Sequence, residues 1–372
     1  MVLVGGGHAH VQVLKAFGES PPTGCNVTVV VDDPVAMYSG MAPGFVAGQY
    51  RREQLEIDVR PLARLANAKV IIARCESVDP QRKLLRLEGH EPVHYDVASF
   101  NIGSTVLGLE LPGVREHALA TRPLSGLVAG IAELVERTRA HDRKTPFQVV
   151  VVGAGVGGVE LAFAVQARLD KDTETPVRVT LIDSRERILP RYPRALVRRI
   201  ERLSARRGIV IRNSVRVAAI DNTGVTLNSG DILPADAVVW VTGPTSHPVF
   251  TQSAGIRTDD RGFALMRSTL QLDGYDDLFA VGDCGTLIDY PKTPKAGVYA
   301  VREGPFITHN LKAWVAGEPL REYVPQGDFL TLLNLGRGYA VGAKWGVTFG
   351  GKWVMRWKDS IDRKFMALFQ LT

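Results

Sequence analysis

Val149-Val150-Val151-Val152 runs directly into Gly153-Ala154-Gly155-Val156-Gly157-Gly158. An uninterrupted apolar run of this length, bounded by glycine, predicts a buried parallel strand. A helical segment at 159–169 follows, and a second apolar run at 177–182 ends at Asp183. A strand, a glycine-rich turn, a helix and a second strand with a terminal acid are typical of a dinucleotide-binding unit.

The three glycines of this turn have different expected roles. Gly153 permits the tight turn, Gly155 lets the backbone approach a pyrophosphate, and Gly158 allows the helix to pack closely on the strand. The helix then directs its N-terminal amides at the phosphates, and the Asp183 carboxylate binds ribose hydroxyls.

The same pattern occurs at the start of the chain. Val2-Leu3-Val4 leads into Gly5-Gly6-Gly7-His8-Ala9-His10, a helical stretch and the apolar run 27–31, which ends at Asp32-Asp33. We expect a second nucleotide to be held by Gly5, Gly7, His8, Ala9 and His10, and by Asp32 in preference to Asp33. His10 replaces the third glycine, so this helix is expected to lie less close to its strand. The two copies predict an α/β fold with two Rossmann-like, three-layer ββα domains.

Composition and charge narrow the class of protein. The chain has 372 residues, a net charge of +6 and three widely spaced cysteines, which argue against a disulfide framework. A strand that begins at residue 2 leaves no room for a signal peptide, so we expect a cytoplasmic location. No zinc-finger or nucleic-acid motif accompanies the positive charge, and we expect neither nucleic-acid binding nor a metal site.

Later blocks complete a family pattern. Asn101-Ile102-Gly103-Ser104 and Thr242-Gly243-Pro244 each follow an apolar run, and Leu278-Phe279-Ala280-Val281-Gly282-Asp283 comes near the C-terminus. This order resembles the pyridine nucleotide-disulfide oxidoreductase superfamily. The resemblance implies an FAD domain at 1–110 and 245–320, an NAD(P)H domain at 111–244 inserted within it, and a C-terminal region at 321–372. It also implies that Gly103, Gly243, Gly282 and Asp283 contact the cofactors.

A narrower resemblance rests on the segments 5–10, 38–44 and 295–302 and on the tail from Asp328 to Met366. These segments are similar to type II NADH dehydrogenase-like flavoproteins, in particular to the stand-alone form of the flavoprotein domain found fused to selenophosphate synthetase. The resemblance implies FAD and NADH as cofactors and places Glu160 near the nicotinamide and the flavin. It also makes Lys295 a residue of the flavin edge.

The absence of a cysteine pair at the expected position excludes a reaction through a redox disulfide there. Disulfide reductases of the superfamily carry a cysteine pair beside the flavin, whereas the corresponding stretch here is Tyr38-Ser39-Gly40-Met41-Ala42-Pro43. We therefore expect direct hydride transfer between nicotinamide and flavin, with Glu160, Pro43 and Lys295 at the reacting centre. Asp183 favours NADH, while the nearby Arg185 and Arg187 leave NADPH open as an alternative.

The electron acceptor and the partners stay open. A small acceptor such as a quinone is the first hypothesis. A redox carrier protein such as a ferredoxin and a nucleotide-sensing flavoprotein without turnover are the alternatives. The apolar residues from Met355 to Gln370 have helical spacing, and basic residues lie between them. This helix is expected either to pack on its own domain or in a homodimer, or to contact the inner face of a membrane peripherally. A helix is also expected at 117–139.

Overall fold

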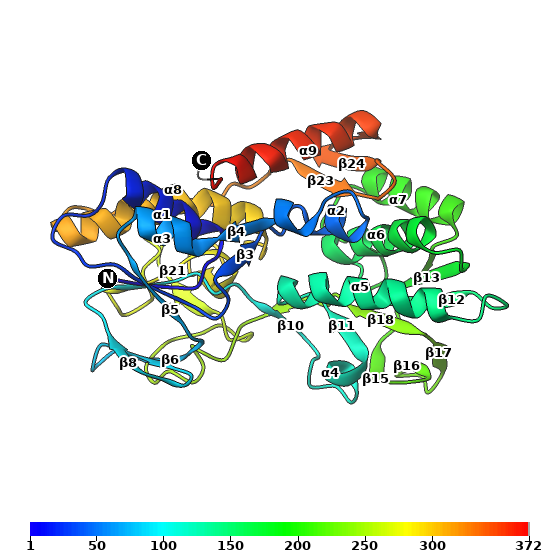
Figure 1. Ribbon diagram of the computed structural model, residues 1–372, viewed down its shortest axis with the longest axis horizontal. Coiled ribbons are helices and arrows are strands. Elements are labelled where there is room, and N and C mark those ends of the chain that lie inside the picture. Colours follow the sequence, from blue (N-terminus) through cyan, green and yellow to red (C-terminus); the bar gives the residue numbers. More distant parts are fainter. Residues whose placement is uncertain (371–372) are drawn as a thin grey trace.

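The computed structural model describes residues 1–370, in which two parallel sheets of five strands each form the framework (Figure 1). Helices cover one face of each sheet, and a small antiparallel sheet covers the other (Figure 1). This three-layer arrangement confirms the predicted fold class of two Rossmann-like units. The sequence pattern that produced it, an apolar strand followed by glycines and a helix, occurs once in each sheet.

The first sheet combines both ends of the sequence. Its strands are all parallel, in the order β21 (Leu278–Ala280), β9 (Ala98–Phe100), β1 (Val2–Val4), β2 (Thr28–Val31) and β5 (Lys69–Ile72). Its helices are α1 (His8–Glu19), α3 (Val59–Leu65) and α8 (Gly297–Ala316). Strand β21 enters only after the chain has completed the second sheet, so the first unit is built from two separate parts of the chain.

The second sheet lies entirely between residues 118 and 240. Its parallel strands have the order β11 (Ala118–Ala120), β18 (Ala237–Trp240), β12 (Phe147–Val152), β13 (Val177–Ile182) and β14 (Val210–Arg212). Its helices are α5 (Leu124–Ala140), α6 (Val156–Asp172) and α7 (Arg194–Arg207).

Strand β12 shows how an apolar run serves two layers. Val149 and Val151 pack among the helices, whereas Val150 and Val152 pack against the antiparallel sheet on the other face. Successive side chains of a strand point to opposite faces, so a strand buried on both sides needs an apolar residue at every position.

Small antiparallel sheets and short elements complete the two units. The covering sheets are β6 (Cys75–Asp79), β7 (Leu84–Leu87) and β8 (His90–His94) on the first unit, and β15 (Val217–Asp221), β16 (Gly224–Leu227) and β17 (Ile232–Pro234) on the second. The paired short strands are β3 (Val35–Met37) with β4 (Glu56–Asp58), β10 (Thr105–Val106) with β19 (Pro244–Thr245), and β20 (Ala264–Met266) with β22 (Gly285–Leu287). The short helical turns are α2 (Ala42–Val46), α4 (Val114–His117), η1 (Arg52–Gln54) and η2 (Gly282–Cys284).

The helix predicted at 117–139 is wrong over its first residues. Residues 118–120 form strand β11, which pairs with β18, and helix α5 begins only at Leu124. Pro123 explains the boundary, because a proline disfavours helical backbone angles in the residue before it. The chain therefore leaves the strand at Thr121 and Arg122 before the helix starts.

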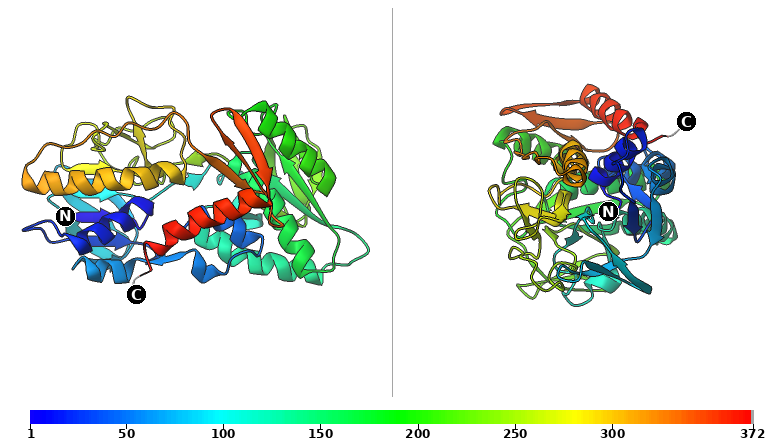
Figure 2. Two further views of the ribbon diagram at one scale, coloured as in Figure 1. Left: turned by 90° about the horizontal axis from the view of Figure 1, so that it is seen from above. Right: turned by 90° about the vertical axis from the view of Figure 1, so that its left-hand side faces the viewer.

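The C-terminal part lies across both units (Figures 1 and 2). Strands β23 (Thr331–Asn334), β24 (Ala340–Lys344) and β25 (Val347–Gly351) form an antiparallel sheet, and α9 (Lys352–Ala367) follows. Residues 371 and 372, the last of the predicted C-terminal region, lie outside the described residues. Among residues 1–370, no helix has both the length and the apolar character that crossing a bilayer requires.

Candidate functional site

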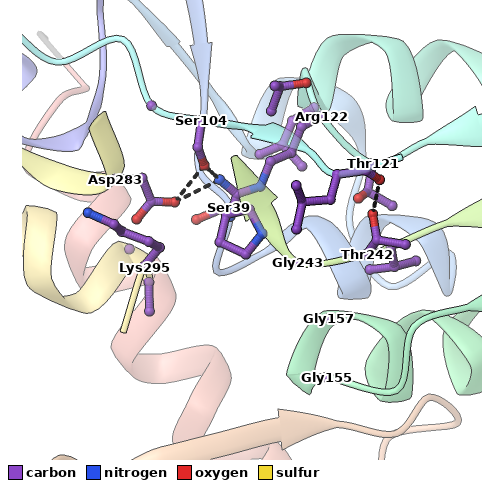
Figure 3. A pocket seen from close by; sticks show the side chains of 18 of the residues that line it. Ser39, Ser104, Thr121, Arg122, Gly155, Gly157, Thr242, Gly243, Asp283 and Lys295 are labelled. Atoms are coloured by element: carbon purple, nitrogen blue, oxygen red, sulfur yellow. Dashed lines mark hydrogen bonds and ion pairs between the residues drawn. The ribbon is translucent and has the colours of Figure 1, made fainter. Parts of the chain in front are cut away.

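The two glycine turns open into one cleft of about 2620 Å³. Asp283 and Lys295 lie on one side of it, and Gly155 and Gly157 lie on the other (Figure 3). Most predicted site residues line this cleft, namely Gly5, Gly7, His8, Asp32, Pro43, Gly103, Gly153, Gly155, Glu160, Asp183, Gly243, Asp283 and Lys295. Ala9, His10, Gly158 and Gly282 are not among its lining residues.

Gly155 and Gly158 of the second turn have different surroundings. A Cβ atom at Gly158 would lie 1.7 Å from the Gly153 carbonyl oxygen, so only glycine lets helix α6 approach its strand. A Cβ atom at Gly155 would have no neighbour within 4 Å. Gly155 faces open space in the cleft, where a pyrophosphate can approach the backbone, and Gly158 is required by the packing behind it.

The first turn replaces the third glycine by a hydrogen-bonded histidine. His10 is fully buried, with Nδ1 2.7 Å from the Gly5 carbonyl oxygen and Nε2 2.9 Å from Ser99 Oγ. The carbonyl corresponding to that of Gly153 therefore gains a side-chain partner here. Burial lowers the pKa of His10 to about 4, which keeps the ring neutral. His10 is not among the residues that line the cleft, and its hydrogen bonds stabilise the turn from behind.

Asn101 is a residue that the sequence reasoning missed. Its Oδ1 accepts the backbone N–H groups of Ala9 and His10, at 3.0 and 3.1 Å, and its Nδ2 donates to the Val281 carbonyl. The side chain thus ties the start of α1 to the segment that carries Gly282 and Asp283. Its place directly after the apolar run 97–100 was the available signal.

Asp283 faces a cation that was also missed. Arg122 Nη1 lies 2.7 Å from Asp283 Oδ2 and also donates to Ser104 Oγ, which itself donates to Asp283 (Figure 3). Arg122 belongs to the turn after β11, so the ion pair joins the second unit to the first. A half-buried guanidinium in a cleft lined by glycine turns is a suitable partner for phosphate oxygens.

Asp183 is engaged on both oxygens. Oδ2 accepts the Ala154 amide at 2.6 Å, and Arg185 binds both oxygens through Nε and Nη2. Burial opposes ionisation of Asp183, but the hydrogen bonds from Arg185 and from the backbone lower its pKa below the ordinary value. The carboxylate is therefore ionised, and its charge is offset by a guanidinium that also lines the cleft.

Glu160 of α6 lines the cleft and is almost completely buried. Its Oε1 accepts the Asn334 backbone N–H at 2.7 Å. Burial raises the pKa of Glu160 to about 7, although Lys358 and the Asn334 amide act in the opposite direction. The carboxyl group can therefore hold or release a proton near neutral pH.

Lys295 reaches the cleft from the segment before α8. Its ammonium donates to the Gly285 carbonyl and, at 2.9 Å, to Thr286 Oγ1, and it lies 4.2 Å from the centre of the Phe263 ring. Burial lowers its pKa. Lys295 is thus held at the wall of the first unit, close to Asp283 (Figure 3).

The cysteines do not form a redox pair in the described chain, because Cys25, Cys75 and Cys284 are all free. Cys284 is completely buried and contacts the carbonyl oxygens of Phe100 and Val281. Cys75 lines the cleft, but burial raises its pKa to about 12. The thiol is therefore protonated at neutral pH and a poor nucleophile.

Comparisons with known proteins agree with this geometry. The NADH dehydrogenase-like protein YutJ of Bacillus subtilis is 24% identical over 88% of this chain and 86% of its own length. A type II NADH:quinone oxidoreductase of Staphylococcus saprophyticus is 23% identical over 87% of this chain and 84% of its own. The solved structure of the sulfide:quinone oxidoreductase of Aquifex aeolicus superposes with a TM-score of 0.81 at 19% identity, covering 99% of this chain and 91% of that one.

The family itself is shown by a match over most of the chain. The model of the pyridine nucleotide-disulphide oxidoreductases matches residues 1–304, which include both glycine turns and Asp283. The predicted enzyme class, an oxidoreductase of pyridine nucleotides, is thereby confirmed. The chain belongs to the pyridine nucleotide-disulphide oxidoreductase family.

Proposed function

We propose that this protein is an FAD-dependent NADH oxidoreductase that delivers electrons to a quinone. The observation that carries the proposal is the single cleft, whose lining includes both glycine turns as well as Glu160 and Pro43. Two dinucleotides held in one cleft can react directly, without a thiol between them. Relatives described as NADH:quinone oxidoreductases support the choice of acceptor.

The residues fit the two cofactors. In the first unit, Gly5, Gly7 and the start of α1 would hold the FAD pyrophosphate together with Arg122 of the second unit, and Asp32 would bind its ribose. In the second unit, Gly153, Gly155 and the start of α6 would hold NADH, with Asp183 on the ribose. This assignment makes residues 1–110 and 245–320 the FAD domain and residues 111–244 the NADH domain.

The protein's own residues supply position and protons. FAD, when bound, accepts hydride from the reduced nicotinamide and passes electrons on. Glu160 holds or gives up a proton at Oε, because its pKa of about 7 lets both forms exist at neutral pH. Lys295 contributes positive charge at the wall next to Asp283. The C-terminal sheet, which supplies the Asn334 amide, closes one side of the cleft and limits the access of water.

We also propose a peripheral contact with a membrane through α9. One side of the helix packs on the chain itself through Val354, Met355 and Met366. On its other side Trp353, Trp357 and Leu368 are 55%, 41% and 47% exposed. Tryptophan beside basic residues favours the boundary between headgroups and acyl chains over bulk water.

The narrower resemblance, to the stand-alone form of the flavoprotein domain fused to selenophosphate synthetase, stays a prediction. It concerns the segments 5–10, 38–44 and 295–302. A link to selenium chemistry is not part of the proposed function.

Anaerobic titration of the purified yellow protein with NADH tests the function. We expect the visible absorbance of the oxidised flavin to disappear and to return when a quinone is added. The variant Cys75→Ala serves as the control for a thiol and is expected to behave as the unchanged protein. A flavin that NADH does not reduce would contradict the proposal and favour a nucleotide sensor. Reoxidation of the flavin by a ferredoxin but not by a quinone would mean that the electron acceptor is a carrier protein instead of a quinone.

A further inference from the structure

Helix α7 carries an unusual row of positive charge. Arg194, Arg198, Arg202 and Arg206 follow one another at intervals of four residues, and all four are exposed. Residues four apart lie on the same side of a helix, so the four guanidinium groups form a stripe. Repulsion between like charges at this spacing destabilises a helix. The stripe therefore needs an explanation outside the folding of α7.

Acidic side chains do not neutralise the stripe in the described part of the chain, although Arg202 Nε donates a hydrogen bond to the Arg198 carbonyl oxygen. Within residues 1–370, none of its four arginines forms an ion pair, and the one acidic residue of α7, Glu201, forms none either. The helix contains six arginines and one glutamate, an excess of five positive charges in a chain with a net charge of +6. The positive charge of the protein is thus concentrated largely on one helix, and this argues for an anionic partner.

The aromatic surface of α9 adjoins this helix. Strands β24 and β25 contact both α7 and α9 (Figures 1 and 2). Arg199 makes the connection, because Nη2 donates to the Gly350 carbonyl at 3.1 Å and to Tyr339 Oη at 3.0 Å. Gly350 belongs to β25 and lies two residues before the start of α9.

The aromatic rings themselves form a row. Phe349 and Trp353 stack with ring centres 5.6 Å apart, and Trp353 and Trp357 stack at 6.4 Å. The exposed Lys352 and Arg356 flank the rings. Basic side chains beside exposed, stacked tryptophans suit a lipid interface better than a protein or nucleic-acid surface, since headgroup phosphates and acyl chains satisfy both kinds of side chain.

We propose that α7 and the outer side of α9 form one docking surface for a bilayer that contains anionic phospholipid. The α7 arginines bind headgroup phosphates, while Trp353 and Trp357 enter the interface. This places a helix of the NADH unit on the membrane as well as the C-terminal helix. The inference rests on the membrane contact proposed for α9, and its test measures lipid binding rather than turnover.

Sedimentation with vesicles tests the surface. The full-length protein with its flavin is mixed either with vesicles of phosphatidylcholine alone or with vesicles of equal parts phosphatidylcholine and phosphatidylglycerol. We expect binding to the mixed vesicles, which weakens as salt is added, and little binding to phosphatidylcholine. Each arginine at an anionic surface contributes about fivefold to the binding constant. The double variant Arg198→Gln/Arg202→Gln is therefore expected to bind the mixed vesicles at least tenfold less tightly.

The matched control removes the same charge elsewhere. Arg82 and Arg86 are exposed on the sheet of β6, β7 and β8, on the side of the molecule opposite α9 (Figure 1). Arg82→Gln/Arg86→Gln is expected to bind as the unchanged protein does. Trp353→Ala/Trp357→Ala is expected to weaken binding at every salt concentration.

Two results would overturn the inference. The first is equal binding by the α7 variant and the unchanged protein. The second is an equal loss in the α7 variant and in the Arg82/Arg86 control, which would mean that net charge alone matters. Flavin reduction by NADH is measured in every variant as a check of folding. Its absence in the unchanged protein would refute the proposed function and leave the lipid result standing.

Discussion

Glu160 of α6 accepts a 2.7 Å hydrogen bond from the backbone amide of Asn334 in β23. Glu160 belongs to the second unit and Asn334 to the C-terminal sheet, and 174 positions separate them. The bond holds a buried carboxyl group at the cleft, where its charge cannot be well solvated. The C-terminal sheet therefore helps to set the protonation state of this carboxyl group.

Glu160→Gln is expected to change the pH dependence of stability. The folded-state pKa of about 7 lies above the ordinary glutamate pKa of 4.5, so protonated Glu160 is favoured in the folded state. Its contribution is complete below the unfolded-state pKa and is lost as pH rises through the folded-state pKa. As pH rises from about 5 to 8, the unchanged protein should therefore lose stability that the variant keeps. The difference between their free energies of unfolding should change by roughly 3 kcal/mol in favour of the variant.

Urea unfolding at several pH values measures this difference. Glutamine keeps an oxygen that can accept the Asn334 amide, so the variant should match the unchanged protein at the acidic end of the series. Glu133→Gln, on the exposed side of α5, is the control and should show no such trend. Parallel curves for Glu160→Gln and the unchanged protein would contradict a raised pKa at Glu160.

The strand and glycine patterns were sufficient to predict the framework. Each pattern is local: an apolar run, a turn that needs glycine and a helix follow within a few residues. The error at residues 118–123 has a local cause as well, because Pro123 was available as a signal for the helix boundary. The alanines and leucine of 118–120 favour a helix by propensity, yet pairing with β18 holds them in a strand.

The site residues that were missed contact partners that are far away in the sequence. Arg122 and Asp283 are 161 positions apart, and Asn101 reaches Val281 across 180. No periodicity or spacing reveals such pairs, because the Asn101–Val281 pair needs β9 and β21 to be neighbours in the first sheet, and the Arg122–Asp283 pair needs the two units to be assembled. His10 was noticed as a missing glycine, but its bonds to Gly5 and Ser99 depend on the neighbouring strand β9.

Two glycines of the second turn should fail in different ways. Gly158→Ala would place a methyl group 1.7 Å from the Gly153 oxygen, so we expect the helix to shift and the protein to lose several kcal/mol of stability. Gly155→Ala meets no atom within 4 Å and should keep the fold, but it should raise the NADH concentration needed to reduce the flavin, because the methyl group enters the cleft. Thermal unfolding and NADH titration separate the two effects. A stable Gly158→Ala protein would contradict the packing role.

Arg185 is expected to influence the choice of nucleotide. Its guanidinium offsets the charge of Asp183, which would otherwise repel a 2′-phosphate. Arg185→Ala should therefore lower kcat/KM for NADPH by about tenfold more than kcat/KM for NADH, the equivalent of one charge-assisted hydrogen bond. Arg187→Ala is the matched control, since Arg187 is a neighbouring arginine that donates to the Pro190 carbonyl rather than to Asp183. An unchanged ratio in Arg185→Ala would remove Arg185 from the coenzyme site.

Arg122 should be required for tight retention of FAD. Arg122→Met keeps an unbranched apolar side chain but removes the ion-pair partner of Asp283 and one phosphate donor of the cleft. We expect the variant to release flavin on dilution at a concentration about tenfold higher than the unchanged protein does, which corresponds to the loss of one charge-assisted contact. Fluorescence of the released flavin measures this, and Arg257→Met, which breaks the exposed pair with Asp273, is the control. If Arg122→Met kept its flavin as firmly as the control, the Arg122–Asp283 pair would serve only to join the two units. A pair that only joins the two units predicts a lower unfolding temperature for Arg122→Met without any change in flavin affinity. Thermal unfolding and flavin release together therefore assign the role of Arg122.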